Sequence, residues 1–346
     1  MDEARLLQIL TRLSGIRILV VGDLFLDKYL VLDGALSEIS LETGLEAYQA
    51  VEKNLLPGAA GTVAKDLRAL GADVSMLTVI GADGEGVEVT EALTNLGIDI
   101  TYTFHASSRF TPTYFKPLLV KTNRVRELNR IDVKNHKQLP SHLEDRLIVS
   151  LREIVPHVDG VAICDQIVER NCGVITDRVR EELVILGSIR PDTVFMADSR
   201  SQIGLFRNVI CKPNHHEAAA AVGETPQDGV DLNDLRCWGR KLQQMTGRPL
   251  VITAAAAGIF VFPQSGDMEH IPAIRVNPPF DAVGAGDSVM SALLSALCAG
   301  ASLREAAVLG SLAASVVISQ IGTTGTASPE QIIEQFRKCG KELYST

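Results

Sequence analysis

The stretch with the clearest potential for chemistry runs NPPFDAVGAGDSVM over residues 277–290. Two prolines and a set of glycines interrupt regular structure there, and the apolar SALLSALCAG that follows predicts a helix beginning near Gly284. A helix N-terminus exposes unpaired N–H groups and a partial positive charge, and glycine lets a bulky anion approach that backbone. The turn formed by Gly284, Ala285 and Gly286 is therefore a candidate cradle for a phosphate group.

An acidic residue, Asp287, follows this turn directly. A carboxylate beside a phosphate cradle would repel the phosphate unless it serves the attacking group. Asp287 could orient a sugar hydroxyl and accept its proton while a phosphoryl group is transferred. Asp, Ser and Gly are also ordinary helix caps, so this stretch alone leaves both interpretations open.

Polar residues at the ends of other predicted elements offer further candidates. Asp23 and Asp27 follow the buried run ILVV, at the carboxyl end of a predicted parallel strand, where α/β proteins bind ligands. The alternative is a strand-end turn with a solvated residue. Asn214 and Glu217, in CKPNHHEAAAAVG, form either a ligand pair or a capping arrangement at a helix start.

The elements that must position these residues alternate between apolar strands and helices along most of the chain. This order predicts a parallel sheet covered by helices on both faces. Two segments, about 28–52 and 100–131, are instead richer in Tyr, Thr and Val and alternate in polarity. We interpret them as inserted antiparallel strands that form a small sheet able to cover a site. No linker interrupts the chain, so we expect a single domain over 1–346 with these two lid segments.

Composition excludes several classes of function. The 346 residues carry a net charge of -9 without blocks of like charge, so we expect no nucleic-acid partner and no membrane association. The six cysteines form no CxxC pair, and MDEARLLQIL is not a signal peptide, which favours a cytoplasmic protein. The motifs of P-loop nucleotide hydrolases, dinucleotide-binding dehydrogenases and α/β hydrolases are absent from the sequence.

Motifs in order along the chain resemble those of the ribokinase-like, PfkB-type carbohydrate kinases. DAVGAGDS resembles their C-terminal signature, VVGDLFLDKYL their first strand, PGAAGTVAKDLRALGA their sugar-binding segment, and CKPNHHEAAAAVG their Lys-Pro-Asn-x-x-Glu motif. The resemblance implies an α/β fold, a three-layer α/β/α sandwich with a mostly parallel sheet and a small β lid. It also implies an ATP-dependent sugar or sugar-phosphate kinase, a phosphotransferase with an alcohol acceptor.

Within the family the chain is similar to the heptose-7-phosphate kinase domain of bacterial heptose kinase/adenylyltransferases. GDLFLDKY, SEIS and TPTYFKPLLVKTNRVRELNRID carry that similarity. It implies phosphorylation of D-glycero-D-manno-heptose 7-phosphate at the anomeric hydroxyl, by a chain that we expect to lack the adenylyltransferase half. The alternatives are another PfkB-type kinase, similar to ribokinase or fructokinase, and a non-catalytic sensor of a sugar phosphate or nucleotide.

The resemblance implies roles for individual residues. Asp287 would be the catalytic base, and the backbone of Gly284, Ala285 and Gly286 would form the anion hole. ATP and Mg²⁺ would be bound by Asn214, Glu217, Thr253 and Gly258, with Glu217 contacting the metal through water. The sugar would be bound by Asp23, Asp27, Gly58, Ala59 and Thr62. Asp281, with the 319–325 loop, would hold a monovalent cation such as K⁺ in members that use one.

The phosphate of a sugar phosphate would need cations in the lid. Lys116, Lys121, Arg124 and Arg126 lie there, and the sequence does not choose among them, although Lys116 stands as our substrate-binding candidate. Lid strands often pair across a two-fold axis in relatives, and exposed strand edges need cover. We therefore expect a homodimer through the lid.

Three positions depart from the family pattern. Ala59 replaces a glycine and Thr62 an asparagine in the sugar segment, and Ala255 replaces a glycine in the phosphate segment TAAAAG. In addition, ISLETGLE stands where the heptose subgroup has ISPEAPVP. These changes leave the identity of the sugar open, while the residues around Asp287 keep the pattern expected for phosphoryl transfer.

Overall fold

Apolar strands build a mostly parallel sheet at the centre of the computed structural model, which describes residues 1–121, 124–225, 229, 231–321 and 324–339. β1 (Arg17–Gly22) lies between β4 (Asp73–Gly81) and β9 (Gly160–Asp165), parallel to both. Beyond them lie β5 (Asp99–Ala106), β10 (Val194–Ser199), β11 (Ile210–Cys211), β12 (Leu250–Thr253), β13 (Ile259–Phe262) and β14 (Glu269–Ile271). The order is β14-β13-β12-β11-β10-β9-β1-β4-β5, with antiparallel pairing only around β13.

Helices cover both faces of this sheet because its strands are apolar on both sides. In β1, Ile18 and Val20 pack into one apolar cluster, and Leu19 and Val21 into the other. The first cluster contains α1 (Glu3–Leu13), α2 (Ala60–Ala69), α3 (Gly84–Asn95), α8 (Ala285–Cys298), α9 (Leu303–Ile318) and α10 (Pro329–Cys339). The second contains α4 (Ser141–Ile154), α5 (Asp177–Ile189), α6 (His215–Ala221) and α7 (Leu232–Thr246). The three-layer α/β/α sandwich predicted from the sequence is confirmed.

The order of the strands creates a switch point between β1 and β9. The chain leaves β1 toward β4 and β5 on one side, and later returns to β9 on the other side. Loops that leave neighbouring strands in opposite directions open a crevice at the carboxyl edge of the sheet. β1 ends at Gly22 and β9 at Asp165, so both deliver their following residues to that crevice.

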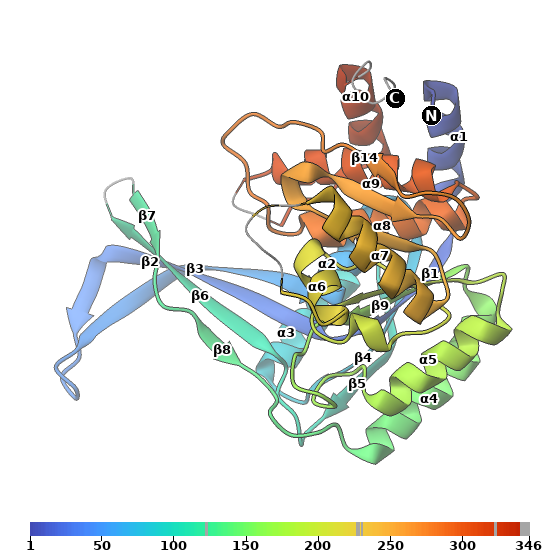
Figure 1. The fold of residues 1–346 in the computed structure, drawn as a ribbon. Helices are drawn as coiled ribbons and strands as arrows, with labels where there is room; N and C mark the ends of the chain where they lie inside the picture. The colour runs from blue at the N-terminus through green and yellow to red at the C-terminus, as the bar shows by residue number, and fades with distance from the viewer. Residues whose placement is uncertain (122–123, 226–228, 230, 322–323, 340–346) are drawn as a thin grey trace.

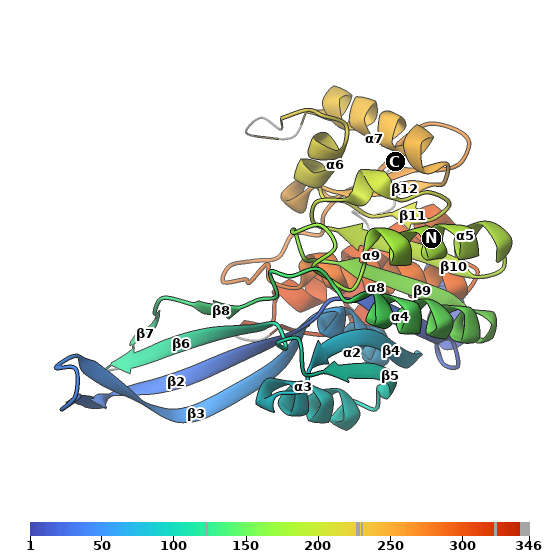
Figure 2. The same ribbon diagram turned by 90° about the horizontal axis from the view of Figure 1, so that it is seen from below.

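A second sheet projects from the body as an arm, which we define as residues 24–59 and 113–133 (Figure 1; Figure 2). It contains β2 (Leu24–Ile39), β3 (Glu46–Ala59), β6 (Thr113–Lys121), β7 (Arg124–Glu127) and β8 (Ile131–Val133). The order is β3-β2-β6-β7, and β8 pairs with β6. A small β lid, as predicted, is therefore present.

The arm differs from the prediction in two details. The first part of the 100–131 segment is β5, which pairs with β4 in the central sheet, and β2 pairs with β6 in parallel. Tyr102 and Phe104 of β5 pack against the apolar cluster of the body. An edge strand of the body and a lid strand have the same alternating polarity, so periodicity could not separate them.

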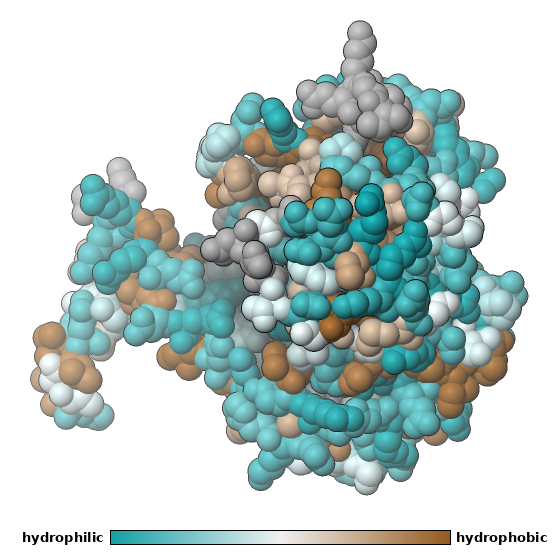
Figure 3. All heavy atoms as spheres, viewed as in Figure 1, coloured by the Kyte–Doolittle hydropathy of each residue, from teal (hydrophilic) through white to brown (hydrophobic). Residues whose placement is uncertain are grey.

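Apolar side chains are exposed along the arm, with Ile39 at 64%, Leu41 at 103% and Leu45 at 70% exposure. Figure 3 shows such residues toward the end of the arm, and a hollow where the arm meets the body. Exposed apolar patches are typical of surfaces that bind another molecule. In the part of the chain that the structure describes, no helix is both long and apolar enough to span a bilayer.

Candidate active site

The glycine turn predicted from the sequence lies at the carboxyl edge of the sheet and opens α8. Gly284 caps the helix with a left-handed backbone, φ 80°. A Cβ atom at this position would also come within 2.7 Å of the Thr324 side chain. Only glycine fits both conditions, because other residues strain at positive φ. Ala285 and Gly286 begin the helix and Asp287 lies in its first turn, as expected from the sequence.

A buried ion pair lies beside Asp287. Asp198 ends β10, and Lys212 follows β11, which pairs with β10 in parallel. The Lys212 Nζ lies 2.7 Å from the Asp198 Oδ2, and Lys212 is 2% exposed. Burial alone would lower the pKa of Lys212, but the carboxylates of Asp198, Glu217 and Asp287 raise it. A Cβ atom at Gly286 would lie 3.9 Å from the Lys212 Nζ, so a positive charge paired with Asp198 lies next to the start of α8.

The charges around Asp287 set its proton affinity. Burial, and then repulsion by Asp198, raise the pKa of Asp287 to about 7, while Lys212, Arg200 and Lys65 act in the opposite direction. A carboxylate with a pKa near the working pH can accept a proton and release it again. Strongly perturbed groups of this kind gather at functional sites.

Asn214 and Glu217 form the capping arrangement that the sequence left open. The Asn214 side chain accepts from the Glu217 N–H at 2.9 Å, and the Glu217 carboxylate accepts from the Asn214 N–H at 2.8 Å. Burial, followed by the charge of Asp198, raises the pKa of Glu217 to about 7. Glu217 therefore caps α6 and also faces the charged group beside Asp287.

Three of the predicted sugar-binding residues come together where the arm joins the body. The Lys116 Nζ lies 3.0 Å from the Asp27 Oδ1 and 3.2 Å from the Tyr29 hydroxyl. Gly58 lies opposite, since a Cβ atom there would come within 3.2 Å of the Asp27 Oδ2. The three residues form the base of the arm on adjacent strands β2, β3 and β6.

Asp23 lies in the connection between β1 and β2 and is 3% exposed. Its carboxylate accepts hydrogen bonds from three backbone N–H groups, those of Gln166, Ile167 and Val174. Burial raises its pKa, and the three N–H groups counteract this. Asp23 thus fixes the segment after β9 at the switch point, and its predicted contact with a sugar stays a prediction.

The two alanines that replace family glycines keep a backbone typical of glycine. Ala59 caps α2 with φ 53° and ψ -116°, and Ala255 has φ 45°. Each residue is strained in this region, at a cost of roughly 1–3 kcal/mol. Thr62 is buried, and its hydroxyl donates to the Pro57 carbonyl at 3.2 Å. Ala59 and Ala255 thus have positive φ values, which glycine adopts without strain.

The remaining predicted residues take separate positions. Thr253 ends β12 and donates its N–H to the Pro213 carbonyl, while Gly258 (φ 94°) packs closely against the Ile271 carbonyl. Asp281 accepts from the Val283 N–H at 3.0 Å and donates its own N–H to the Ile318 carbonyl at 2.9 Å. Within the 319–325 loop, positions 322 and 323 lie outside the described residues.

Three of the four lid cations, Lys121, Arg124 and Arg126, lie at the end of β6 and on β7, far along the arm (Figure 1).

Sequence reasoning missed Asp198, Arg200 and Lys212. The sequence contained a signal that could have identified the first two. Asp198 and Arg200 follow an apolar run in TVFMADSR, just as Asp23 follows the first strand, and the carboxyl ends of parallel strands are where α/β proteins bind ligands. Lys212 lies inside the motif that supplied Asn214 and Glu217.

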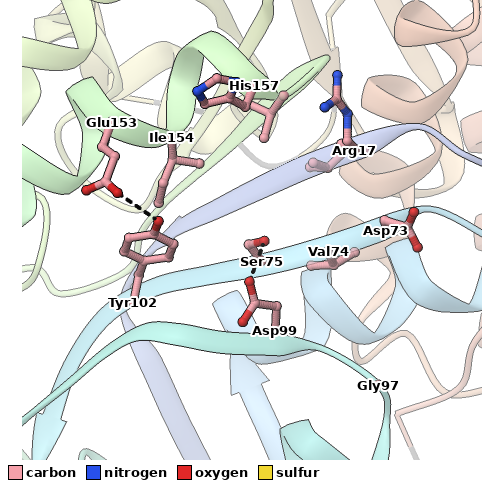
Figure 4. Close-up of a pocket in the computed structure, with 12 residues that line it drawn as sticks. Arg17, Asp73, Val74, Ser75, Gly97, Asp99, Tyr102, Glu153, Ile154 and His157 are labelled. Carbon is pink, nitrogen blue, oxygen red and sulfur yellow. Dashed lines mark hydrogen bonds between the residues drawn. The ribbon is translucent and has the colours of Figure 1, made fainter.

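A cavity of about 560 Å³ lies at the opposite edge of the sheet (Figure 4). It is lined by Arg17, Asp73 and Asp99, the first residues of β1, β4 and β5. Amino ends of parallel strands are not where α/β proteins bind ligands. None of the predicted site residues lines this cavity, so we place the candidate active site at the carboxyl edge.

A three-layer sandwich with a projecting β arm, and with a glycine turn and a titratable aspartate at the carboxyl edge of its sheet, defines a ribokinase-like kinase fold. The model of the pfkB family of carbohydrate kinases matches residues 30–331, and the chain belongs to that family. It is thus a sugar kinase, a phosphotransferase with an alcohol acceptor, as the sequence predicted.

The comparison with curated proteins finds the "Bifunctional protein HldE" of several bacteria. The chain is 31% identical over 335 residues to the protein of Trichlorobacter lovleyi, covering 96% of this chain and 65% of that protein. The protein of Geobacter sulfurreducens is 30% identical over 334 residues, with the same two coverages. The predicted resemblance to bifunctional heptose kinase/adenylyltransferases is confirmed, and the chain spans slightly less than two thirds of their length.

Solved structures share the fold at low identity. Phosphofructokinase-2 from Escherichia coli in complex with potassium matches with a TM-score of 0.71 and 17% identity, covering 95% of this chain and 100% of that chain. Ribokinase from Arabidopsis thaliana complexed with ribose and ATP matches with a TM-score of 0.69 and 18% identity, covering 94% and 99%.

The ion pair beside Asp287 predicts the effect of Lys212→Met. Removing one member of a buried pair leaves the other charge uncompensated, at a cost of about 3 kcal/mol of unfolding free energy. Because Lys212 lowers the pKa of Asp287, that pKa should rise further in the variant. Urea unfolding and carboxyl NMR titration measure the two effects. The double variant Asp198→Asn/Lys212→Met serves as the control and should regain most of the stability; an equally unstable double variant would contradict this account.

Proposed function

We propose that this chain is an ATP- and Mg²⁺-dependent kinase acting on a sugar phosphate, with D-glycero-D-manno-heptose 7-phosphate as the substrate and its anomeric hydroxyl as the acceptor. The observation that carries the proposal is the position of Asp287. Asp287 lies in the first turn of α8, next to the backbone N–H groups that follow Gly284, and burial raises the pKa of its carboxyl to about 7. A base and an anion-binding backbone therefore adjoin each other at the crevice.

Phosphoryl transfer follows from this arrangement. Asp287 accepts the proton of the acceptor hydroxyl as its oxygen bonds to the transferred phosphorus and the bond from that phosphorus to the leaving oxygen breaks. The N–H groups of Ala285 and Gly286 stabilise negative charge on the transferred group. Lys212 adds a fixed positive charge beside them. Asp287 ends the step protonated and returns the proton to solvent.

The nucleotide side fits residues on α6 and β12. Asn214, Glu217, Thr253 and Gly258 would hold the ATP phosphates and Mg²⁺, with Glu217 acting through water, because a carboxylate offers the hard oxygen that Mg²⁺ prefers. The metal, when bound, neutralises charge on the phosphates. Asp281 would hold a monovalent cation such as K⁺. The neighbours solved with ATP and with potassium support these assignments.

The choice of sugar rests on the resemblance to the heptose kinase subgroup and on the 31% identity to HldE. A ribokinase- or fructokinase-like activity is the first alternative. A non-catalytic sensor is the second, and it draws support from Ala255 and from Thr62, whose hydroxyl already donates to Pro57. A cytoplasmic location, where ATP is available, belongs to the same proposal.

Asp287→Asn tests the proposal. The variant cannot accept a proton, so phosphorylation of heptose 7-phosphate should fall about 10³-fold. Binding of the sugar phosphate, measured by calorimetry, should change little. Asp267→Asn, a fully exposed position, provides the control. Turnover that survives in Asp287→Asn contradicts the role of this residue, and binding without turnover on any sugar supports the sensor instead.

The pKa of Asp287 predicts the pH dependence of the reaction. The carboxylate form is active, so kcat/KM should rise with pH through about 7 and level off above it. Burial also raises the pKa of Glu217 to about 7. If both carboxylates must lose a proton, a plot of log kcat/KM against pH should have an acid-side slope above one at low Mg²⁺. At saturating Mg²⁺, which favours the ionised Glu217, this slope should approach one. A profile that is flat between about pH 5.5 and 8 would rule out Asp287 as the base.

We also propose that the chain forms a homodimer through the arm. A cavity of about 750 Å³ on the arm is lined by apolar residues such as Leu30, Leu32 and Pro117, and Leu36 and Ile39 are exposed nearby. A second copy of the arm would cover this surface. Light scattering should give twice the 37.3 kDa of one chain, and Leu36→Asp with Ile39→Asp should give the monomer. Val149→Asp, an exposed apolar position on α4, is the matched control; a monomeric unmodified protein contradicts the proposal.

A further inference from the structure

We propose that Arg130, Lys134 and Arg200 form a subsite, around Tyr114, for a phosphate group that the substrate already carries. This inference rests on the proposed function and deepens it, because it assigns the substrate to the sugar phosphates from the charges of the site. It also replaces the distal lid cations considered from the sequence with three residues at the junction of arm and body.

The arm contributes Arg130, and Lys134 directly follows its last strand, β8. The Arg130 guanidinium lies 4.6 Å and the Lys134 Nζ 5.6 Å from the centre of the Tyr114 ring. Both cations share one carboxylate, since Asp132 lies 2.6 Å from the Arg130 Nε and 3.7 Å from the Lys134 Nζ. The positive charges of Arg130 and Lys134 and the negative charge of Asp132 together leave a net charge of plus one. The ring and the carboxylate hold the two cations in place before a ligand arrives.

The body contributes Arg200, directly after β10. Its backbone N–H donates to the Asp165 carbonyl at 3.0 Å, and its guanidinium makes only long contacts, 3.3 and 3.4 Å, with the neutral side chain of Gln166. Among the described residues, no carboxylate lies within ion-pair distance of Arg200. Gln166 directly precedes Ile167, which lies in a small apolar cluster with Phe25, and Tyr114 packs against that cluster. Burial raises the pKa of Tyr114 on the arm and of Asp287 at the mouth of α8, and the charge of Arg200 acts in the opposite direction on both. Arg200 therefore lies between the two parts of the site.

The other cations near the crevice already have partners. Lys116 pairs with Asp27 and Lys212 with Asp198, while Lys65 donates to the Thr324 carbonyl. Arg109 donates to the Lys137 and Cys172 carbonyls. Arg130, Lys134 and Arg200 thus bring three positive charges against one close carboxylate, that of Asp132, in the described part of the chain. Two excess positive charges match a phosphate dianion, and arginines bind phosphate through paired N–H groups.

Tyr114 gives the subsite its position relative to the acceptor hydroxyl. It pairs in register with Asp27, at the base of the arm, and its ring packs edge-on against Phe25 at 5.2 Å. Its hydroxyl has no hydrogen-bond partner among the residues that the structure describes, and so can donate to a phosphate oxygen. A sugar lying against Asp27 and Gly58 would have its phosphate at Tyr114 and its acceptor hydroxyl toward Asp287.

The test compares two ligands that differ only in the phosphate: heptose 7-phosphate and the same heptose without it. Binding is measured by calorimetry without nucleotide, and turnover with ATP and Mg²⁺. In Arg130→Ala and in Arg200→Ala, the Kd for heptose 7-phosphate should rise about 10- to 100-fold, because a charged hydrogen bond is lost. Affinity for the unphosphorylated heptose should change less than about twofold.

Two further variants complete the test. Lys137→Ala removes an exposed cation three residues beyond Lys134 and should leave both affinities unchanged. Arg130→Met keeps an apolar stem over the Tyr114 ring, and should lose phosphate selectivity even if Arg130→Ala folds poorly.

The possible outcomes separate the two proposals. Equal losses for both ligands in Arg130→Met and Arg200→Ala would overturn the subsite, while wild-type turnover would leave the proposed function intact. An unmodified protein that turns over no sugar would overturn the proposed function. In that case the binding ratio of the two ligands still decides whether the phosphate subsite exists.

Discussion

The buried pair of Asp198 and Lys212 is the interaction on which the chemistry of the site depends. It forms because β10 and β11 are adjacent parallel strands, so the residues at their carboxyl ends meet. Asp198 raises and Lys212 lowers the pKa of Asp287, and the same two groups act on Glu217 in the same directions. One ion pair thus acts on the pKa of both the proposed proton acceptor, Asp287, and the proposed metal-binding group, Glu217.

The arm and the body are joined at the switch point of the sheet. β1 passes into β2 with only Asp23 between them, and Asp23 also fixes the segment after β9 through three backbone hydrogen bonds. The base of the arm is therefore rigidly tied to the carboxyl edge, where α8 begins. In the proposed phosphate subsite, this connection would let residues of the arm, such as Tyr114 and Arg130, act on the same ligand as residues of the body.

The strained alanines bear on whether the chain has kept its chemistry. Ala59 and Ala255 occupy left-handed backbone positions that glycine would adopt without strain, and each lies in a segment assigned to a ligand. Both segments therefore have a backbone conformation that favours glycine although the residue is alanine.

Much of the fold and part of the site could be predicted from the sequence, because they depend on local order. The alternation of apolar strands and helices determined the sandwich, and the Gly284 turn with Asp287 determined the start of α8 and its acidic first turn. The sequence could not separate β5 from the arm, since both alternate with a period of two. Nor could it bring Asp198 to Lys212, or Arg200 to Tyr114, because strand order and the path of the arm decide which distant residues meet. Charge balance at the site is a property of those long-range neighbours, so only the tertiary structure decided which cations have a carboxylate of their own and which share one or have none.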